Sequence, residues 1–153
     1  MRQDLKAHYA DERLPRYTSY PASPHFTGAV GPAAYAEWLR ALPAEATASL
    51  YLHVPFCRSL CWYCGCHTHI TPHDAPIDDY LASLRREIGL VVGHLERRPA
   101  VRHVHFGGGT PTIMAPGAFR ELMALLRAHF PFAPKAEIAV EIDPRTLAPA
   151  MIR

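Results

Sequence analysis

Short apolar runs alternate with longer helical patterns along most of the chain, and this alternation limits the possible folds more than any other feature. Strands are predicted at 50–54, 101–106 and 138–142, and amphipathic helices at 77–95 and from residue 116 onward. Helical connections of this length join parallel strands through right-handed crossovers. The sequence therefore predicts an α/β fold with three parallel strands.

The first 47 residues differ from the rest. Prolines and a glycine interrupt polar and aromatic residues over 1–30, so this segment is predicted to be an extended arm. A short helix is predicted from Pro32, which suits a first helical position, to Leu42. We therefore divide the chain into an arm with a short helix at 1–47 and a sheet-forming region at 48–153.

Composition excludes several classes of protein. The chain has 153 residues, of which 49% are hydrophobic and 20% charged, as in one folded domain rather than a disordered chain. The sequence has no block of basic residues with interleaved aromatics, so it does not predict a nucleic-acid partner. The first residues have no apolar signal segment, and no apolar run could span a bilayer. The chain is therefore expected to be cytoplasmic.

All four cysteines, Cys57, Cys61, Cys64 and Cys66, lie within ten residues, directly after the first predicted strand. Disulfides are rare in the reducing cytosol, so such a group indicates a metal or redox site. The spacing is C-x3-C-x2-C-x-C. Three thiolates can hold a [4Fe–4S] cube and leave one iron without a cysteine ligand, and that iron can then bind another molecule.

Zinc is the main alternative at this loop. Structural zinc usually binds cysteine or histidine pairs that a longer loop separates. His67, His69 and His73 follow the cysteines and could complete a set of four ligands. The compact spacing favours an iron–sulfur cluster, and we interpret the three histidines as polar loop residues.

Two further signals fall at predicted strand ends. A glycine run at 107–109 precedes Thr110, and Glu141 lies in the third predicted strand. Glycines let a ligand approach the backbone, although this run is not a dinucleotide fingerprint. Glu141 should point to the opposite face from Val140 and Ile142, toward solvent or toward a ligand's hydroxyl groups. Ligands gather outside the carboxyl ends of parallel strands, so these signals predict one site.

The cysteine loop resembles that of a known superfamily. The run YLHVPFC at 51–57, with Cys61, Tyr63 and Cys64 following, is similar to the cluster loop of radical S-adenosyl-L-methionine (AdoMet) enzymes. Cys66 and the segment PRYTSYP at 15–21 resemble, more narrowly, the oxygen-independent coproporphyrinogen III oxidases. Related haem-chaperone-like proteins share the three-cysteine loop but typically lack the Cys66 equivalent and the arm motif, so the oxidase family is favoured.

The resemblance implies a fold and a set of site residues. The fold would be a radical-AdoMet (β/α) barrel, incomplete here because the chain ends after its third strand, and the isolated chain is expected to be poorly soluble or inactive. The implied cofactors are a [4Fe–4S] cluster and AdoMet. The resemblance implies that the cluster ligands are Cys57, Cys61 and Cys64. It implies AdoMet contacts for Tyr51, Gly108, Gly109, Thr110 and Glu141, and a second AdoMet near Tyr63. Cys66 would have a catalytic and cofactor-contacting role and would not bind the cluster.

The resemblance also implies an activity. It is the oxidative decarboxylation of two propionate side chains of coproporphyrinogen III to vinyl groups, which gives protoporphyrinogen IX. The implied partners are this substrate and a one-electron donor such as flavodoxin or ferredoxin, and the protein is expected to be a monomer. A haem-binding chaperone and a small zinc module stay open as alternatives.

Overall fold

The computed structural model describes residues 23–62 and 64–152. The chain divides into two compact units, residues 1–33 and 34–153. In the first unit, a 3-10 turn, η1, covers Ser23–His25. The second unit holds the rest of the fold, and helix α2 (Pro32–Arg40) lies almost wholly within it. Helix α2 is two residues shorter than predicted.

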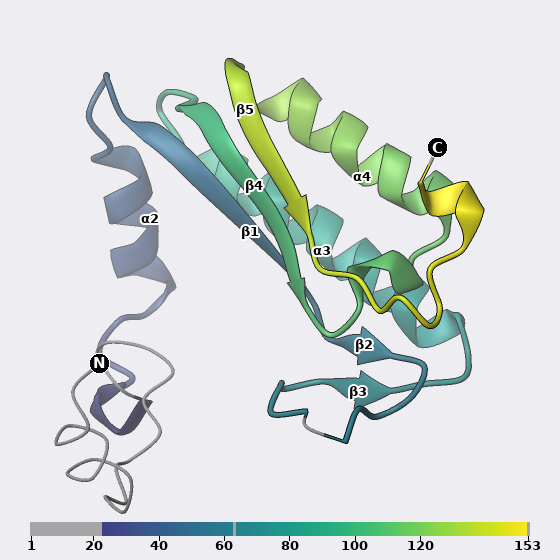
Figure 1. Ribbon diagram of the computed structural model, residues 1–153. Coiled ribbons are helices and arrows are strands. Elements are labelled where there is room, and N and C mark those ends of the chain that lie inside the picture. Colours follow the sequence, from purple (N-terminus) through teal and green to yellow (C-terminus); the bar gives the residue numbers. More distant parts are fainter. Residues whose placement is uncertain (1–22, 63, 153) are drawn as a thin grey trace, which may run out of the picture. The chain divides into compact units, whose positions relative to one another are not determined.

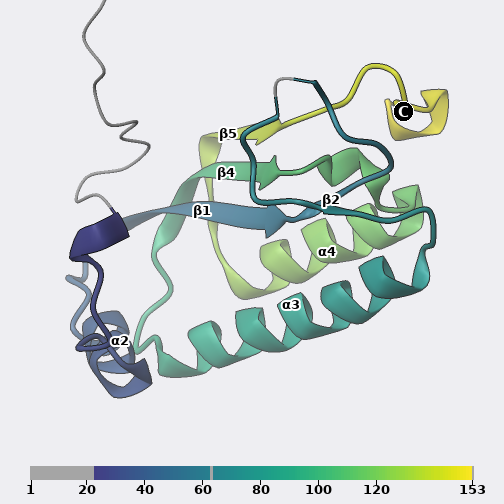
Figure 2. The same ribbon diagram turned by 90° about the horizontal axis from the view of Figure 1, so that it is seen from below.

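A three-stranded parallel sheet forms the second unit, with strand order β1-β4-β5. In chain order the elements are β1 (Thr47–Val54), α3 (Ala75–His94), β4 (Ala100–Gly108), α4 (Pro116–His129) and β5 (Phe132–Val140). Both crossover helices, α3 and α4, cover the same face of the sheet (Figures 1 and 2). Helices on one face only are the arrangement of a barrel wall, and the predicted α/β class is confirmed.

The core lies between this face of the sheet and the two helices. Along β1, Leu52 and Val54 are buried, whereas Tyr51 is exposed on the other face. This period of two is what a strand with one covered face requires. Helices α3 and α4 contribute buried residues at helical spacing. The core includes Leu52, Val54, Ile77, Leu81, Leu84, Ile88, Val92, Val101, Val104, Phe106, Leu122 and Leu126.

The bounds predicted for the third strand are wrong. Strand β5 begins six residues earlier than predicted and ends at Val140, so Glu141 and Ile142 lie beyond it. The pairing of β5 with β4 shifts register between Val101 and His103, opposite a stretch of β5 that contains Pro134. Proline has no amide hydrogen to donate to a ladder, which explains an irregularity there. The Glu141 amide still donates to the Phe106 carbonyl oxygen at 2.9 Å, so the backbone stays beside β4 for one more residue.

A second, very small sheet was not predicted. Strands β2 (Phe56–Cys57) and β3 (His69–Ile70) pair in parallel and close the base of the cysteine loop. The His69 amide donates to the Pro55 carbonyl oxygen at 2.7 Å, and the Thr71 amide to the Cys57 carbonyl oxygen at 3.0 Å. The pair fixes where the cysteine loop leaves the sheet and where it returns. In the part of the chain that the structure describes, no helix has the length and apolar character needed to cross a membrane.

Candidate active site

The cysteine loop starts at the carboxyl end of β1 and carries four free thiols. Cys57 is buried, Cys61 and Cys64 are partly exposed, and Cys66 is exposed. The Cys64 amide donates a hydrogen bond to the Cys61 carbonyl oxygen at 3.0 Å. The loop therefore presents its thiols beyond the strand ends, the edge where the sequence predicted the site.

The glycine run packs directly against the entry to the cysteine loop. The Gly109 amide donates to the Val54 carbonyl oxygen at 2.9 Å, and the Thr110 amide to the Phe56 carbonyl oxygen at 2.8 Å. A Cβ atom at Gly109 would lie 2.5 Å from the Phe56 carbonyl oxygen and 2.7 Å from the Thr68 hydroxyl. The space beside Gly109 is thus filled by the protein's own loop, so this glycine is required by packing whether or not a ligand binds.

Gly108 is required for a different reason. Its φ angle is 110°, a conformation that side-chain-bearing residues rarely adopt. A Cβ atom there would also lie 2.6 Å from the His53 ring. With no side chain, the Gly108 amide can reach the Glu141 carboxylate, to which it donates at 3.0 Å. The glycine run therefore ties the end of β4 to both neighbouring strands.

Glu141 belongs to a polar cluster on the uncovered face of the sheet. Its second carboxylate oxygen lies 3.2 Å from Nε2 of His105. The His105 ring stacks on the Tyr51 ring, with centroids 5.6 Å apart and planes 21° apart. The Tyr51 hydroxyl in turn lies 3.0 Å from Nδ1 of His53. These four side chains form a continuous chain of contacts from β1 across β4 to the end of β5, which we call the Glu141 cluster.

Two ionisable groups are influenced by the negative charge of Glu141. Burial is the largest cause of the raised pKa of Tyr51, and the charges of Glu141 and Cys66 add to it. Burial is also the largest cause of the raised pKa of Cys66. The charge of Cys64 and a hydrogen bond with it raise this pKa further, and the charge of Glu141 adds a smaller effect. Both shifts favour the protonated forms of these groups. They also place Cys66 in the electrostatic neighbourhood of the Glu141 cluster.

The segment after Glu141 also reaches the cysteine loop. Arg145 donates to the Sγ atom of Cys61 at 3.0 Å. It also forms a salt bridge with Asp143, with the closest N–O distance at 2.7 Å. The hydrogen bonds from Arg145 hold the pKa of Asp143 below its usual value. Neither Asp143 nor Arg145 was predicted from the sequence as a site residue.

The structure tests whether these residues suit an iron–sulfur cluster. Among residues 23–62 and 64–152, no three His, Cys, Asp or Glu side chains converge closely enough to hold a single metal ion. A cube makes a different demand, because each of three thiolates binds a different iron atom and the sulfurs stay apart. Thiolates are the ligands that such clusters use, and three of them lie on one short loop. The donor set therefore fits a [4Fe–4S] cluster.

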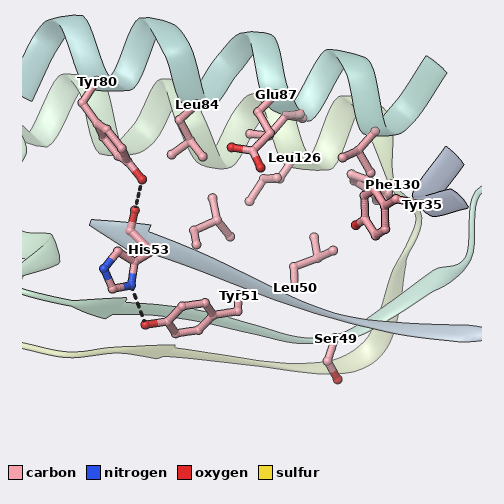
Figure 3. Close-up of a pocket in the computed structure, with 13 residues that line it drawn as sticks. Tyr35, Ser49, Leu50, Tyr51, His53, Tyr80, Leu84, Glu87, Leu126 and Phe130 are labelled. Carbon is pink, nitrogen blue, oxygen red and sulfur yellow. Dashed lines mark hydrogen bonds between the residues drawn. The ribbon is translucent and has the colours of Figure 1, made fainter. Parts of the chain in front are cut away.

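A cavity of about 300 Å³ lies along β1, and the side chains that line it are drawn in Figure 3. Its lining comes from β1 and α3, together with Tyr35 of α2, Leu126 of α4 and Phe130, and Glu87 is the one carboxylate among the described residues that line it. The Tyr80 hydroxyl donates to the His53 carbonyl oxygen at one end of the cavity. Of the residues predicted for the site, only Tyr51 lines it, so the cavity is not the candidate active site.

The structure thus brings together most of the residues that the sequence singled out. Tyr51, Gly108 and Glu141 meet in one cluster, and Cys57 contacts Thr110. Tyr63 and the arm motif at 15–21 lie outside the described residues. Sequence reasoning missed His53 and His105. The signal for His53 was its position two residues after Tyr51, which puts both on one face of a strand.

Comparison with known proteins agrees with this geometry. The family model described as the Radical SAM superfamily matches residues 51–153. The chain belongs to the Radical SAM superfamily. Membership extends from Tyr51, through the cysteine loop, the glycine run and Glu141, to the last residue, so all of the site described above lies within the matched region.

Two curated relatives that this radical SAM chain resembles have the same name. The chain is 61% identical over 152 residues to the oxygen-independent coproporphyrinogen III oxidase of Bradyrhizobium diazoefficiens. This match covers 99% of the chain and 34% of the relative. The chain is also 45% identical over 137 residues to the protein of that name from Paracoccus denitrificans, and this match covers 90% of the chain and 30% of the relative. The chain spans about a third of the length of the curated relatives it matches.

A solved structure is similar as well. The coproporphyrinogen III oxidase (HemN) of Escherichia coli, described as a radical SAM enzyme, superposes with a TM-score of 0.78 at 38% identity. The match covers 86% of this chain and 30% of the other. The predicted partial barrel is therefore confirmed: the three parallel strands and their helices form part of a radical SAM fold.

Proposed function

We propose that this protein is a radical AdoMet oxidoreductase that converts two propionate side chains of coproporphyrinogen III to vinyl groups, giving protoporphyrinogen IX. The observation that carries the proposal is the 61% identity, over 99% of the chain, to a relative named oxygen-independent coproporphyrinogen III oxidase. The contact between the cysteine loop and the glycine run supports it, because it brings the proposed cluster and AdoMet residues to one edge of the sheet.

In this proposal Cys57, Cys61 and Cys64 each bind one iron of a [4Fe–4S] cluster, and the fourth iron has no protein sulfur ligand. When bound, the cluster and AdoMet supply the one-electron chemistry that removes hydrogen from a propionate β-carbon. Loss of CO2, with one further electron passed to a one-electron acceptor, would then leave the vinyl group. The protein residues hold the reactants in place and keep water away, while the cofactors carry the difficult steps.

The Glu141 cluster is the proposed AdoMet-binding region, together with Gly109 and Thr110. The Glu141 carboxylate is held by the Gly108 amide and His105, which leaves it lone pairs to accept hydrogen bonds from ligand hydroxyl groups. Tyr51 presents an aromatic face and is 59% exposed, so a ligand can reach it. Tyr63 is proposed to contact a second AdoMet.

Cys66 has a separate proposed role. Cys57, Cys61 and Cys64 already supply the three thiolates of the proposed cluster, and Cys66 is the exposed cysteine of the four. We assign Cys66 to the catalytic and cofactor contacts rather than to the cluster. The division of the chain at residue 47, the monomeric state and an electron donor such as flavodoxin or ferredoxin belong to the same proposal.

The experiment is anaerobic reconstitution of the protein, expressed at its full natural length, followed by assay with coproporphyrinogen III, AdoMet and a reductant. The expected result is a brown protein with about four irons per chain that forms protoporphyrinogen IX and methionine. Cys61→Ala should form neither product, and Cys66→Ser should keep the irons. A protein that holds the cluster and binds haem tightly but never decarboxylates the substrate would contradict the proposal and favour a haem-handling protein.

A further inference from the structure

Arg145 connects two parts of the site that lie 84 residues apart in the chain. Its guanidinium donates to the Cys61 sulfur at 3.0 Å. Cys61 is one of the three proposed cluster ligands, so this residue contacts a sulfur that would carry iron. A thiolate bound to iron keeps lone pairs that can still accept such a hydrogen bond.

The guanidinium is held in position by its own turn. Nε of Arg145 donates to both carboxylate oxygens of Asp143, at 2.9 and 3.2 Å, and a terminal nitrogen donates at 2.7 Å. The Arg145 amide donates to the same carboxylate at 3.0 Å, and the Thr146 amide to the Asp143 carbonyl oxygen at 3.1 Å. The Asp143 side chain is only 12% exposed, so the acceptor is itself fixed. The conformation of the Arg145 side chain is therefore already fixed by Asp143, so the hydrogen bond to Cys61 costs little further side-chain entropy.

The donor to Cys61 differs in kind from the donors to Cys57. The Cys57 sulfur accepts a hydrogen bond from the neutral hydroxyl of Thr68 at 3.4 Å and lies 3.3 Å from that of Thr110. Hydrogen bonds from charged donors are about twice as strong as neutral ones. Hydrogen bonds to cluster sulfurs are among the factors that set the reduction potential, because they stabilise the extra negative charge of the reduced cluster.

We propose that Arg145 is a positioning residue that hydrogen-bonds the Cys61 thiolate and raises the reduction potential of the cluster; this inference rests on the proposed function. The negative charge of Asp143 offsets the net charge of Arg145. The effect therefore depends on the directional N–H···S bond, for which Asp143 orients the guanidinium. An easier reduction would let a weak one-electron donor start the reaction.

The test uses the protein at its full natural length, reconstituted without oxygen, in which cluster reduction is followed by EPR during a redox titration without AdoMet. Arg145→Leu and Arg145→Gln should move the potential to more negative values. At the potential where half of the unchanged protein's clusters are reduced, the reduced fraction should fall severalfold in Arg145→Leu. Arg145→Lys, which keeps a charged donor, should recover part of the difference. Arg85→Gln, which removes a partner of Glu121 on the helices, should titrate like the unchanged protein.

A second measurement is independent of turnover. The Fe–S(Cys) stretching bands in the resonance Raman spectrum should rise in frequency in Arg145→Leu, because loss of the hydrogen bond strengthens one iron–sulfur bond. Unchanged potentials and unchanged bands in variants with full iron content would overturn the inference and leave the proposed function intact. Loss of the cluster in all three variants, with Arg85→Gln normal, would also overturn it, in favour of a purely structural role. A protein that never forms a cluster would refute the proposed function itself.

Discussion

The sulfur of Cys57 lies 3.3 Å from the hydroxyl of Thr110, and both residues are buried. The contact joins the first residue of the cysteine motif to the residue that follows the glycine run, 53 positions later. A cluster held by the loop and a ligand held by the glycine run would therefore be neighbours.

Gly109→Ala should destabilise the fold, because the new Cβ would lie 2.5 Å from the Phe56 carbonyl oxygen, a backbone atom that cannot move freely. The expected loss of unfolding free energy is about 1–3 kcal/mol, measured by urea denaturation. Gly93→Ala is the matched control, since nothing lies within 4 Å of its added Cβ and the residue is in α3. It should stabilise by about 0.5–1 kcal/mol. Equal stability of the two variants would show that the glycine run does not pack as described.

Glu141→Gln should weaken AdoMet binding without unfolding the protein. The substitution keeps the shape but replaces charged acceptors with weaker ones, and a hydrogen bond to a charged group contributes about 1.5–3 kcal/mol. The dissociation constant for AdoMet, measured by calorimetry, should rise about 10- to 100-fold. Glu137→Gln, an exposed residue of β5, should leave it unchanged. If both variants bind AdoMet like the unchanged protein, Glu141 is not part of the binding site.

The ionisation of Tyr51 offers a test of the Glu141 cluster that needs no cofactor. Its pKa is raised above 10.0 by burial and then by the charges of Glu141 and Cys66. The ultraviolet difference between the protein and Tyr51→Phe should therefore show a phenolate titration with its midpoint above pH 10. Glu141→Gln should move that midpoint downward. Since the folded state holds this proton more tightly, its contribution to stability is present below pH 10 and is lost as the pH rises through the shifted pKa.

A midpoint that stays in place in Glu141→Gln would mean that the carboxylate is farther from Tyr51 than the structure places it. His105→Phe keeps a ring that can stack on Tyr51 but removes the nitrogen that contacts Glu141, so it separates the two contacts. It should preserve the raised pKa of Tyr51 and remove the contact between residue 105 and the Glu141 carboxylate.

Leu81→Ala should cost about 2–5 kcal/mol of unfolding free energy, because Leu81 is 2% exposed in the core between α3 and the sheet. Leu90→Ala, on the same helix but 66% exposed, should change it by less than about 0.5 kcal/mol. Thermal or urea unfolding measures both. Similar losses for the two variants would contradict the assignment of the buried face of α3.

The order of strands and helices could be predicted because apolar periodicity is a local property. The bounds of β5 could not, since residues 132–137 combine Pro134 with charged residues and show no alternation. Strands β2 and β3 have two residues each, which is too short for any pattern.

The site was predictable to the same extent. Cysteine spacing and glycine runs are visible in the sequence, so the loop and the strand ends were found. The pairing of Tyr51 with His105 depends on the register between β1 and β4, which no local pattern specifies. Arg145 was missed for the same reason, because only the folded chain places it beside Cys61.

The proposed chemistry requires that one iron of the cluster has no cysteine ligand and can bind AdoMet. Mössbauer spectra of protein reconstituted with ⁵⁷Fe, recorded with and without AdoMet, test it most directly. We predict that one iron site out of four changes its signal when AdoMet is added, while the other three do not. Spectra that are the same with and without AdoMet, with four equivalent irons, would contradict the account.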